Sequence, residues 1–300
     1  MNYFKKISLS ALIIVTASLL QAKESEIKIT TINVNNGVYM LMGQGGNIGL
    51  SVGEDGVFMI DDQFAPLSAK IKAAISKISK KPLKFVINTH WHFDHTGGNE
   101  NFGKDGAIIV SHNNVRKRMS KEGFIKAFNK TIPAAPKVAL PIITFNDEIN
   151  FYFNNEEIEV LHQKNAHTDG DSIIFFKSSN VVHTGDIYFN GFYPFIDSSS
   201  QGSMNGIITS VNYILSRIND KTKIIPGHGK LSNKKELISY RDTLIILRDR
   251  MQALIKEGKS IDEIIAMKPN ADLDETWGKG FLNPETFLKI LYGVIKDNMK

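Results

Sequence analysis

A dense group of potential metal ligands lies between Asn88 and Gly98, where the sequence reads Asn-Thr-His-Trp-His-Phe-Asp-His-Thr-Gly-Gly. Three of the eight histidines and one carboxylate fall within six positions of this motif: His90, His92, Asp94 and His95. On an extended backbone alternate side chains point to the same side, so His90 and His92 can reach one ion. Asp94 and His95, beyond the following turn, can reach a second ion. A lone histidine is most simply a structural residue, but four crowded donors are best satisfied by a cation.

A catalytic zinc ion uses three protein ligands and keeps one position for water, so each ion requires a further donor from elsewhere in the chain. Three candidates each follow a strand-like run and precede a glycine-bearing loop: His167 in Asn-Ala-His-Thr-Asp-Gly-Asp, Asp186 in His-Thr-Gly-Asp and His228 in Pro-Gly-His-Gly. Proteins that mix strands and helices place working residues at such strand ends. The chain has no cysteine, so all donors are nitrogen or oxygen. This donor set favours two zinc ions, while iron or manganese would also fit.

The elements around these donors form two similar halves, each with several strands followed by a helix. This arrangement predicts two sheets face to face with helices outside, a four-layer αββα sandwich in the α/β class. Residues 120–141 have no clear periodicity and are either a lid or an excursion of the chain. The strand-like runs are 27–32, 38–42, 48–52, 57–60, 83–87, 107–110, 142–145, 149–153, 158–162, 172–176, 181–183 and 223–226. Helical spacing marks 68–80, 113–119, 204–218 and most of the chain from 233 on, with a turn at 268–273.

The first residues predict export. Residues 1–22 carry two lysines, a 14-residue apolar run and then a small residue, Ala22, which is typical of a secretory signal peptide. The run is shorter than the ~20 residues that span a bilayer, so we expect no stable membrane anchor. The remaining 23–300 then form one domain with a helical C-terminal tail (about 233–300), in the periplasm or secreted. Removal of residues 1–22 lowers the net charge from +5 to +3, which does not indicate a nucleic-acid partner.

The order His-x-His-x-Asp-His, followed by His, Asp and His, resembles the metallo-β-lactamase superfamily over about residues 27–230. The resemblance implies the αββα fold and a small-molecule substrate. It also implies a ligand set for each of two ions. One ion would lie on His90, His92 and His167, a second on Asp94, His95 and His228, with Asp186 bridging the pair.

The Thr-Gly-Asp setting of Asp186 is closest to the glyoxalase II-like and lactonase-like hydrolases of that superfamily. Lactamases with a cysteine ligand cannot be matched, and those with an all-His/Asp site match six ligands but not Asp186. Phe93 stands where the family often has a small residue, so it is expected to narrow the pocket. The tail after Asn233 shows no glutathione-binding pattern, which disfavours a glutathione thioester.

These observations predict a metal-dependent hydrolase. A hydroxide between the two ions would attack an ester, lactone, thioester or amide (β-lactam) bond, and Asp94 would orient it and transfer protons. Export adds weight to β-lactams. The alternatives are an iron-dependent oxidoreductase of the persulfide dioxygenase type and a non-catalytic carrier, although a carrier does not need a bridging carboxylate. The aromatic run 187–196 is either a pocket wall or core packing.

Overall fold

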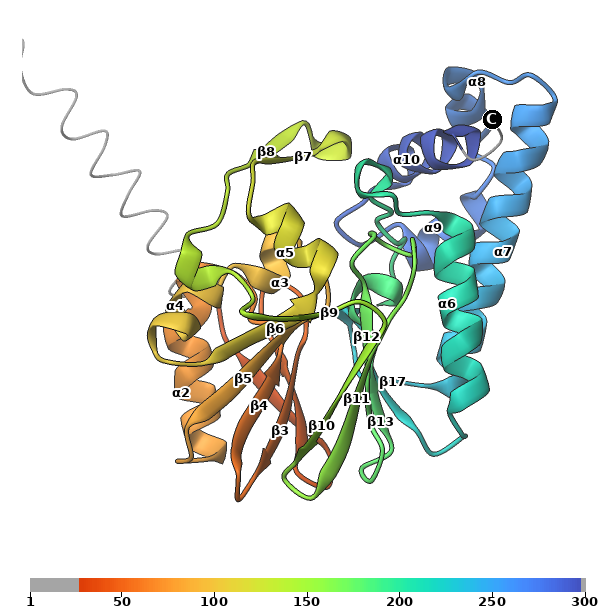
Figure 1. Cartoon of the computed structure of the whole chain (residues 1–300). Helices are drawn as coiled ribbons and strands as arrows, with labels where there is room; N and C mark the ends of the chain where they lie inside the picture. Colours follow the sequence, from red (N-terminus) through yellow and green to blue (C-terminus); the bar gives the residue numbers. More distant parts are fainter. Residues whose placement is uncertain (1–26, 298–300) are drawn as a thin grey trace, which may run out of the picture.

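The computed structural model describes residues 27–297 of the chain (Figure 1). The expected signal peptide, residues 1–22, lies outside the described residues, so export stays a prediction. Among residues 27–297, no helix is both long and apolar enough to span a bilayer.

The first sheet has seven strands. Four of them form an antiparallel meander of runs separated by tight turns, and three parallel strands extend this meander. Helices α2 (Ser68–Ile78) and α4 (Asn99–Lys104) cover its outer face, where Ile71, Ile75 and Phe102 are buried. The apolar residues of the helix expected over 68–80 therefore face this sheet. In sheet order the strands are β1 (Thr30–Asn35), β2 (Val38–Met42), β3 (Ile48–Gly53), β4 (Gly56–Ile60), β5 (Leu83–Asn88), β6 (Ile108–His112) and β9 (Ile143–Phe145).

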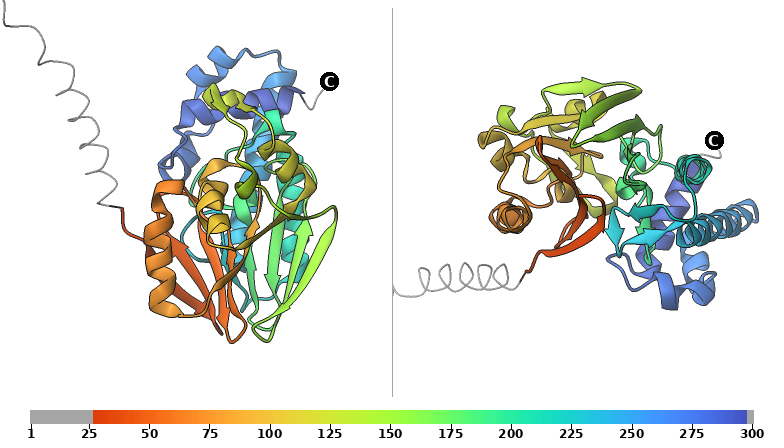
Figure 2. Two further views of the ribbon diagram at one scale, coloured as in Figure 1. Left: turned by 60° about the vertical axis from the view of Figure 1, so that its left-hand side comes forward. Right: turned by 90° about the horizontal axis from the view of Figure 1, so that it is seen from below.

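The second sheet has six strands and is covered by α6 (Met204–Arg217) and α7 (Lys234–Lys256), as Figures 1 and 2 show. Apolar residues of α6 and α7 pack together with those of the sheet's outer face in one cluster. The chain then continues through α8 (Ile261–Met267), α9 (Ala271–Trp277) and α10 (Pro284–Asp297). In sheet order the strands are β10 (Glu148–Phe153), β11 (Glu156–His162), β12 (Ser172–Phe176), β13 (Val181–His183), β15 (Lys223–Ile225) and β17 (Ser232–Asn233).

The two sheets pack face to face through a mainly apolar layer. Phe58 and Ile87 of the first sheet are buried in one cluster with Ile174 and Phe176 of the second. The rings of Phe58 and Phe151 meet edge to face, with centroids 5.1 Å apart. The expected αββα sandwich is therefore confirmed.

Four segments differ from the expectations drawn from the sequence. The first strand, expected at 27–32, spans Thr30–Asn35. Residues 120–141 include a small hairpin, β7 (Gly123–Ile125) and β8 (Lys130–Ile132), above the ends of the sheets. The expected turn at 268–273 is wrong in its second half, because α9 begins at Ala271. The turn expected within the first histidine motif is a short helix, α3 (Phe93–Thr96), and α5 (Asn113–Met119) matches its expected range.

Candidate metal centre

The first histidine motif follows the carboxyl end of β5, where the buried strand leaves the sheet. The backbone bends over residues 89–91 and then enters α3, with His92 in an extended conformation at the start of that helix. The motif is therefore not the continuous extended segment that was expected from the sequence. The two imidazoles still converge, because His90 presents Nε2 and His92 presents Nδ1, and these atoms lie 3.1 Å apart.

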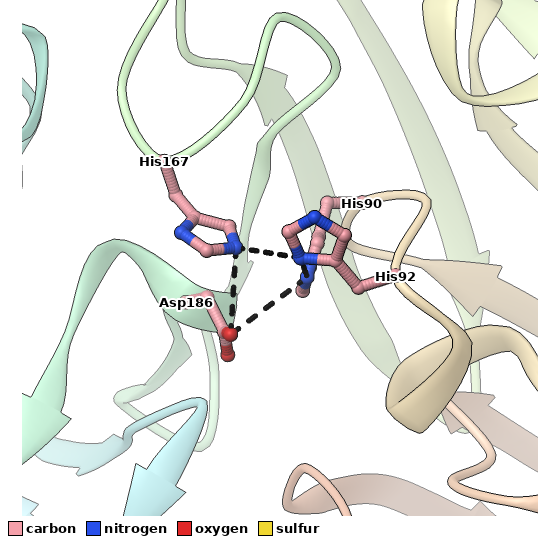
Figure 3. A group of neighbouring side chains, drawn as sticks. All are labelled: His90, His92, His167 and Asp186. Carbon is pink, nitrogen blue, oxygen red and sulfur yellow. Dashed lines mark hydrogen bonds and ion pairs between the residues drawn. The ribbon is translucent and has the colours of Figure 1, made fainter. Parts of the chain in front are cut away.

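The first group of donors comprises His90, His92, His167 and Asp186, one atom of each lying within 4.8 Å of the others. Figure 3 shows the three imidazoles and the carboxylate pointing toward one another. Nε2 of His167 lies 2.9 Å from Nδ1 of His92. All four residues are buried. Four donors from three separate segments thus surround one point in the interior.

The second group comprises Asp94, His95 and His228, again with one atom of each within 4.8 Å of the others. Oδ2 of Asp94 lies 3.2 Å from Nε2 of His228 and 3.6 Å from Nε2 of His95. His228 reaches the group because β16 (His228–Gly229) pairs in parallel with β14 (Phe189–Asn190). The side chains of Asp94 and His228 are about one-fifth exposed, whereas His95 is fully buried, so this group opens toward the surface.

Asp186 lies between the two groups and presents one oxygen to each. Its Oδ2 lies 3.8 Å from Nε2 of His90 and 3.5 Å from Nε2 of His167. Its Oδ1 lies 3.0 Å from Nε2 of His95 and 3.5 Å from Nε2 of His228, yet it makes no hydrogen bond with any described residue although it is buried. The structure thus brings all seven sequence-predicted donors into one cluster. Their role as metal ligands stays a prediction.

The charges in this cluster are those that a cation would balance. Burial lowers the pKa of His167 to about 4, and burial together with the charge of His95 lowers the pKa of His90 well below its usual value. Burial also opposes the charge of His228, but Asp186 and Asp94 outweigh it and raise its pKa to about 9. The same carboxylates raise the pKa of His95 well above its usual value.

The two carboxylates of the cluster show the complementary effect. Burial favours their neutral forms, yet the nearby histidines lower the pKa of Asp94 to about 2 and that of Asp186 well below its usual value. The two carboxyl groups thus favour their anionic forms, and His95 and His228 favour their protonated forms. A divalent ion would replace such protons, and nitrogen and oxygen donors suit zinc, iron or manganese. The residues present thus fit a pair of metal ions.

The imidazoles are held in place by acceptors that the sequence analysis did not identify. Oδ2 of Asp61 lies 2.7 Å from Nδ1 of His95, and Oδ2 of Asp197 lies 3.0 Å from Nε2 of His92. The ring of His167 donates to the carbonyl oxygen of Phe195 at 2.8 Å. Such partners fix the tautomer and orientation of ligating histidines. Asp61 directly follows the apolar strand β4, the same signal that marks the other donors at strand ends.

Close packing against the cluster requires two glycines. A Cβ at Gly46 would lie 2.0 Å from Cε1 of His95, and one at Gly227 would lie 2.1 Å from Oδ1 of Asp186. Only a residue without a side chain fits at either position. The Gly-Gly turn of the first meander therefore packs directly against the cluster.

A cavity of about 270 Å³ opens onto the cluster. Phe93 lines it, as the sequence analysis expected of a residue that narrows the pocket. The aromatic run 187–196 serves both of its proposed roles, because Phe195 lines the cavity whereas Tyr188 and Tyr193 are buried in the core. Apart from the cluster residues, the remaining lining residues come from four other segments of the chain. The full lining is Gln44, Phe64, His92, Phe93, Asp94, Ile125, Phe128, Asp186, Phe195, His228 and Phe281.

The cluster lies at one end of two facing sheets. Comparison with protein families gives a match over the greater part of the chain. The family model of the metallo-beta-lactamase superfamily matches residues 42–248. The chain therefore belongs to the metallo-beta-lactamase superfamily, which confirms the resemblance and the fold that its motifs predicted.

The chain is similar to curated proteins of different named activities. It is 20% identical over 190 residues to "Metallo-beta-lactamase type 2" of Bacillus cereus, which covers 63% of this chain and 69% of that protein. It is 26% identical over 145 residues to "2,4-dinitroanisole O-demethylase subunit alpha" of Nocardioides sp. (strain JS1661), covering 46% of this chain and 40% of that subunit.

Solved structures show the same fold. A stereoselective inverting sec-alkylsulfatase from Pseudomonas sp. matches with a TM-score of 0.63 and 18% identity, over 88% of this chain and 50% of that one. A metallo-beta-lactamase from Pontibacter korlensis matches with a TM-score of 0.58 and 16% identity, over 73% of this chain and 99% of that one. The chain thus spans half or less of the demethylase subunit and the sulfatase, and nearly all of this lactamase.

Proposed function

We propose that the protein is an exported hydrolase that uses two divalent metal ions, zinc in the first place, to cleave an ester, lactone, thioester or amide bond of a small molecule. The observation that carries the proposal is the position of Asp186. One carboxylate oxygen faces each donor group, and the buried Oδ1 has no hydrogen bond to a described residue. A buried carboxylate whose two oxygens face two separate donor groups would serve simply as a bridge between two cations.

His90, His92 and His167 would hold the first ion, Asp94, His95 and His228 the second, and Asp186 both. Two ions bound there would supply a water nucleophile with a pKa of roughly 7 and a Lewis acid for the developing negative charge.

Asp94 belongs both to the second donor group and to the cavity wall, so its carboxylate can orient a water molecule toward a bound substrate. Its pKa of about 2 keeps it anionic and able to accept a hydrogen bond at neutral pH. The phenylalanines of the cavity wall give the site an apolar lining, which would strengthen electrostatic interactions at the reacting group once a substrate fills the cavity.

The Thr-Gly-Asp setting of Asp186 supports the glyoxalase II-like or lactonase-like branch of the superfamily. In the structure Thr184 precedes a single turn, Gly185–Ile187, that directs the carboxylate into the cluster. Gly185 adopts a positive φ of 51° in that turn, a conformation that glycine tolerates best. The motif therefore has a geometric purpose, which is to deliver a carboxylate from the end of β13 to both donor groups.

The proposal is tested with purified protein supplied with zinc and a panel of nitrocefin, homoserine lactones, thioesters and phosphodiesters. We expect turnover of at least one lactam, lactone or thioester substrate, and loss of that turnover in Asp94→Ala. Asp147→Ala is the matched control and should retain activity, because Asp147 is exposed and belongs neither to the two donor groups nor to the cavity lining. Circular dichroism would establish that both variants fold.

Two results would overturn the proposal. Full activity in a folded Asp94→Ala variant would remove the assigned role of that carboxylate. Purified protein that contains more iron than zinc and hydrolyses none of the panel would favour the iron-dependent oxidoreductase instead. The export part of the proposal is tested separately, by locating the full chain and residues 23–300 in cell fractions.

A further inference from the structure

The cavity above the cluster has two sides of opposite character. Its floor carries the cluster residues His92, Asp94, Asp186 and His228. Its other described walls are five phenylalanines, one isoleucine and the neutral amide of Gln44, and none of the described lining residues is a lysine or an arginine. A substrate whose scissile group faces the floor therefore has its remaining atoms among aromatic rings.

Two of these rings form an incomplete roof. Phe128, on the turn Lys126–Phe128 of the β7–β8 hairpin, is 42% exposed, and Phe281, in the loop before α10, is 57% exposed. Their ring centroids lie 6.5 Å apart, although the residues come from distant parts of the sequence. Figure 1 shows the hairpin and the C-terminal helices at the same end of the two sheets. Large exposed aromatic rings at a cavity mouth indicate a site where an apolar ligand completes the packing.

The rest of the roof is continuous with buried rings. Phe128 packs against Phe195 at 4.8 Å between centroids, and Phe281 lies 6.2 Å from the imidazole of His228. Phe195 in turn lies 5.7 Å from the ring of His92. The aromatic wall thus runs from the cluster to the mouth without interruption by a charged group of a lining residue.

We propose that the pocket binds substrates whose group remote from the scissile bond is apolar and uncharged, an alkyl chain of medium length or an aryl ring, and that Phe128 and Phe281 hold this group. The inference rests on the proposed function only in that the scissile group faces the cluster. An anionic end would lose its hydration against these rings and find no opposite charge on the phenylalanine, isoleucine and glutamine walls.

One cation of the hairpin, Lys130, contacts an aromatic ring of the cavity wall. Nζ of Lys130 lies 3.6 Å from the centroid of the Phe93 ring, in a cation–π contact that ties the hairpin to the cavity wall. Lys130 is not among the residues that line the cavity. A Lys130→Ala variant therefore serves as the test for an anionic substrate.

The experiment measures kcat/KM of the zinc-loaded protein with p-nitrophenyl acetate, butyrate and octanoate, and with the p-nitrophenyl monoester of succinic acid, corrected for spontaneous hydrolysis. Each buried methylene should raise kcat/KM by up to about fourfold. The succinate ester, as long as butyrate but anionic at its far end, should be at least about tenfold poorer than butyrate.

Three aromatic variants locate the site. Phe128→Ala and Phe281→Ala should lower kcat/KM for octanoate by about 5- to 30-fold and leave acetate within about twofold. Phe124→Ala is the matched control, because Phe124 lies on the same hairpin and is 49% exposed but does not line the cavity. It should leave the whole series unchanged.

Equal rates along the ester series, or equal effects of Phe128→Ala and Phe124→Ala, would overturn the inference. A preference for the succinate ester that is lost in Lys130→Ala would overturn it in favour of an anionic substrate. If no ester is hydrolysed, the proposed function loses support while the inference is still decided by calorimetric titration with 2-octanone and acetone. Tighter binding of 2-octanone, weakened in Phe128→Ala but not in Phe124→Ala, would support it, and equal binding would refute it.

Discussion

Two adjacent aspartates at the end of β4 provide a matched pair that tests how the cluster is held together. Asp61 and Asp62 are both fully buried. Asp61 accepts hydrogen bonds from the backbone and hydroxyl of Thr89, both at 2.7 Å, and its Oδ2 lies 2.7 Å from Nδ1 of His95. Asp62 accepts one bond, from the backbone nitrogen of Gly98 at 2.8 Å, and its Oδ2 has no partner among the described residues. The same Asp→Asn substitution therefore has different consequences at the two positions.

Asp61→Asn removes the anionic acceptor that orients the imidazole of His95, a proposed metal ligand. Loss of such a partner weakens metal binding by roughly 10- to 100-fold, or about 1.4 to 2.7 kcal/mol. At Asp62, burial and the neighbouring charge of Asp61 raise the carboxyl pKa well above its usual value. A neutral amide is therefore a close substitute there, and Oδ1 can still accept from Gly98. We expect Asp62→Asn to keep metal affinity within about twofold of the parent.

The affinities are measured by competition with a chromophoric zinc chelator, which resolves the two binding steps. Asp61→Asn should weaken one step by the stated factor and affect the other step less, because Asp61 contacts His95 directly but reaches His90 only through the hydroxyl of Thr89, which lies 3.0 Å from Nδ1 of His90. Thermal unfolding of the metal-free variants would show whether either change destabilises the fold. Equal affinities of the two variants would refute the assignment of Asp61 as the residue that positions His95.

Four further substitutions and a change of pH have effects of known sign. Phe93 borders both the cavity above the cluster and a second cavity of about 150 Å³, so Phe93→Ala should join them and move the preferred acyl length in the ester series toward longer chains. Gly46→Ala should reduce bound zinc per chain, because its Cβ would overlap the imidazole of His95, a proposed metal ligand. Gly293→Ala should stabilise α10 by about 0.5–1 kcal/mol in chemical denaturation, because the added Cβ would meet no neighbouring atom within 4 Å. The stacked rings of His112 and His162 have lowered pKa values, to about 4 for His112, both chiefly because of burial. Both imidazoles therefore take up protons at a higher pH in the unfolded chain than in the folded protein. The free energy of unfolding is unaffected above about pH 6.5 and decreases as the pH falls toward 4. The melting temperature should thus drop between pH 7 and 5, and less so in His162→Gln.

The sequence predicted the sheets and the seven donors because both have local signals. Apolar runs separated by turn residues predict strands such as β2 and β12, whose observed bounds equal the expected ones. The donors stand in glycine-bearing motifs directly after such strands, and the order of those motifs resembles that of one superfamily. Local patterns of this kind require no knowledge of which strands are neighbours.

The remaining parts of the site depend on contacts between distant segments. Asp197 is a single acid in a loop, and only the folded chain places it against His92. Phe281 joins the cavity because α10 packs on α7, which the helical pattern of the tail did not specify. The β7–β8 hairpin is short, and the pattern of residues 120–141 does not indicate that Phe128 lines the cavity. Tertiary packing, and not local propensity, selects these residues.

The metal content of the purified protein tests the central claim most directly. The chain would be dialysed to equilibrium against zinc and then freed of unbound metal, and the bound ions counted by inductively coupled plasma mass spectrometry. Two ions per chain are expected in the parent, and one in His228→Ala, because the first donor group keeps all four of its members in that variant. A parent protein that binds one ion or none would contradict the interpretation of Asp186 as a bridge between two metal sites.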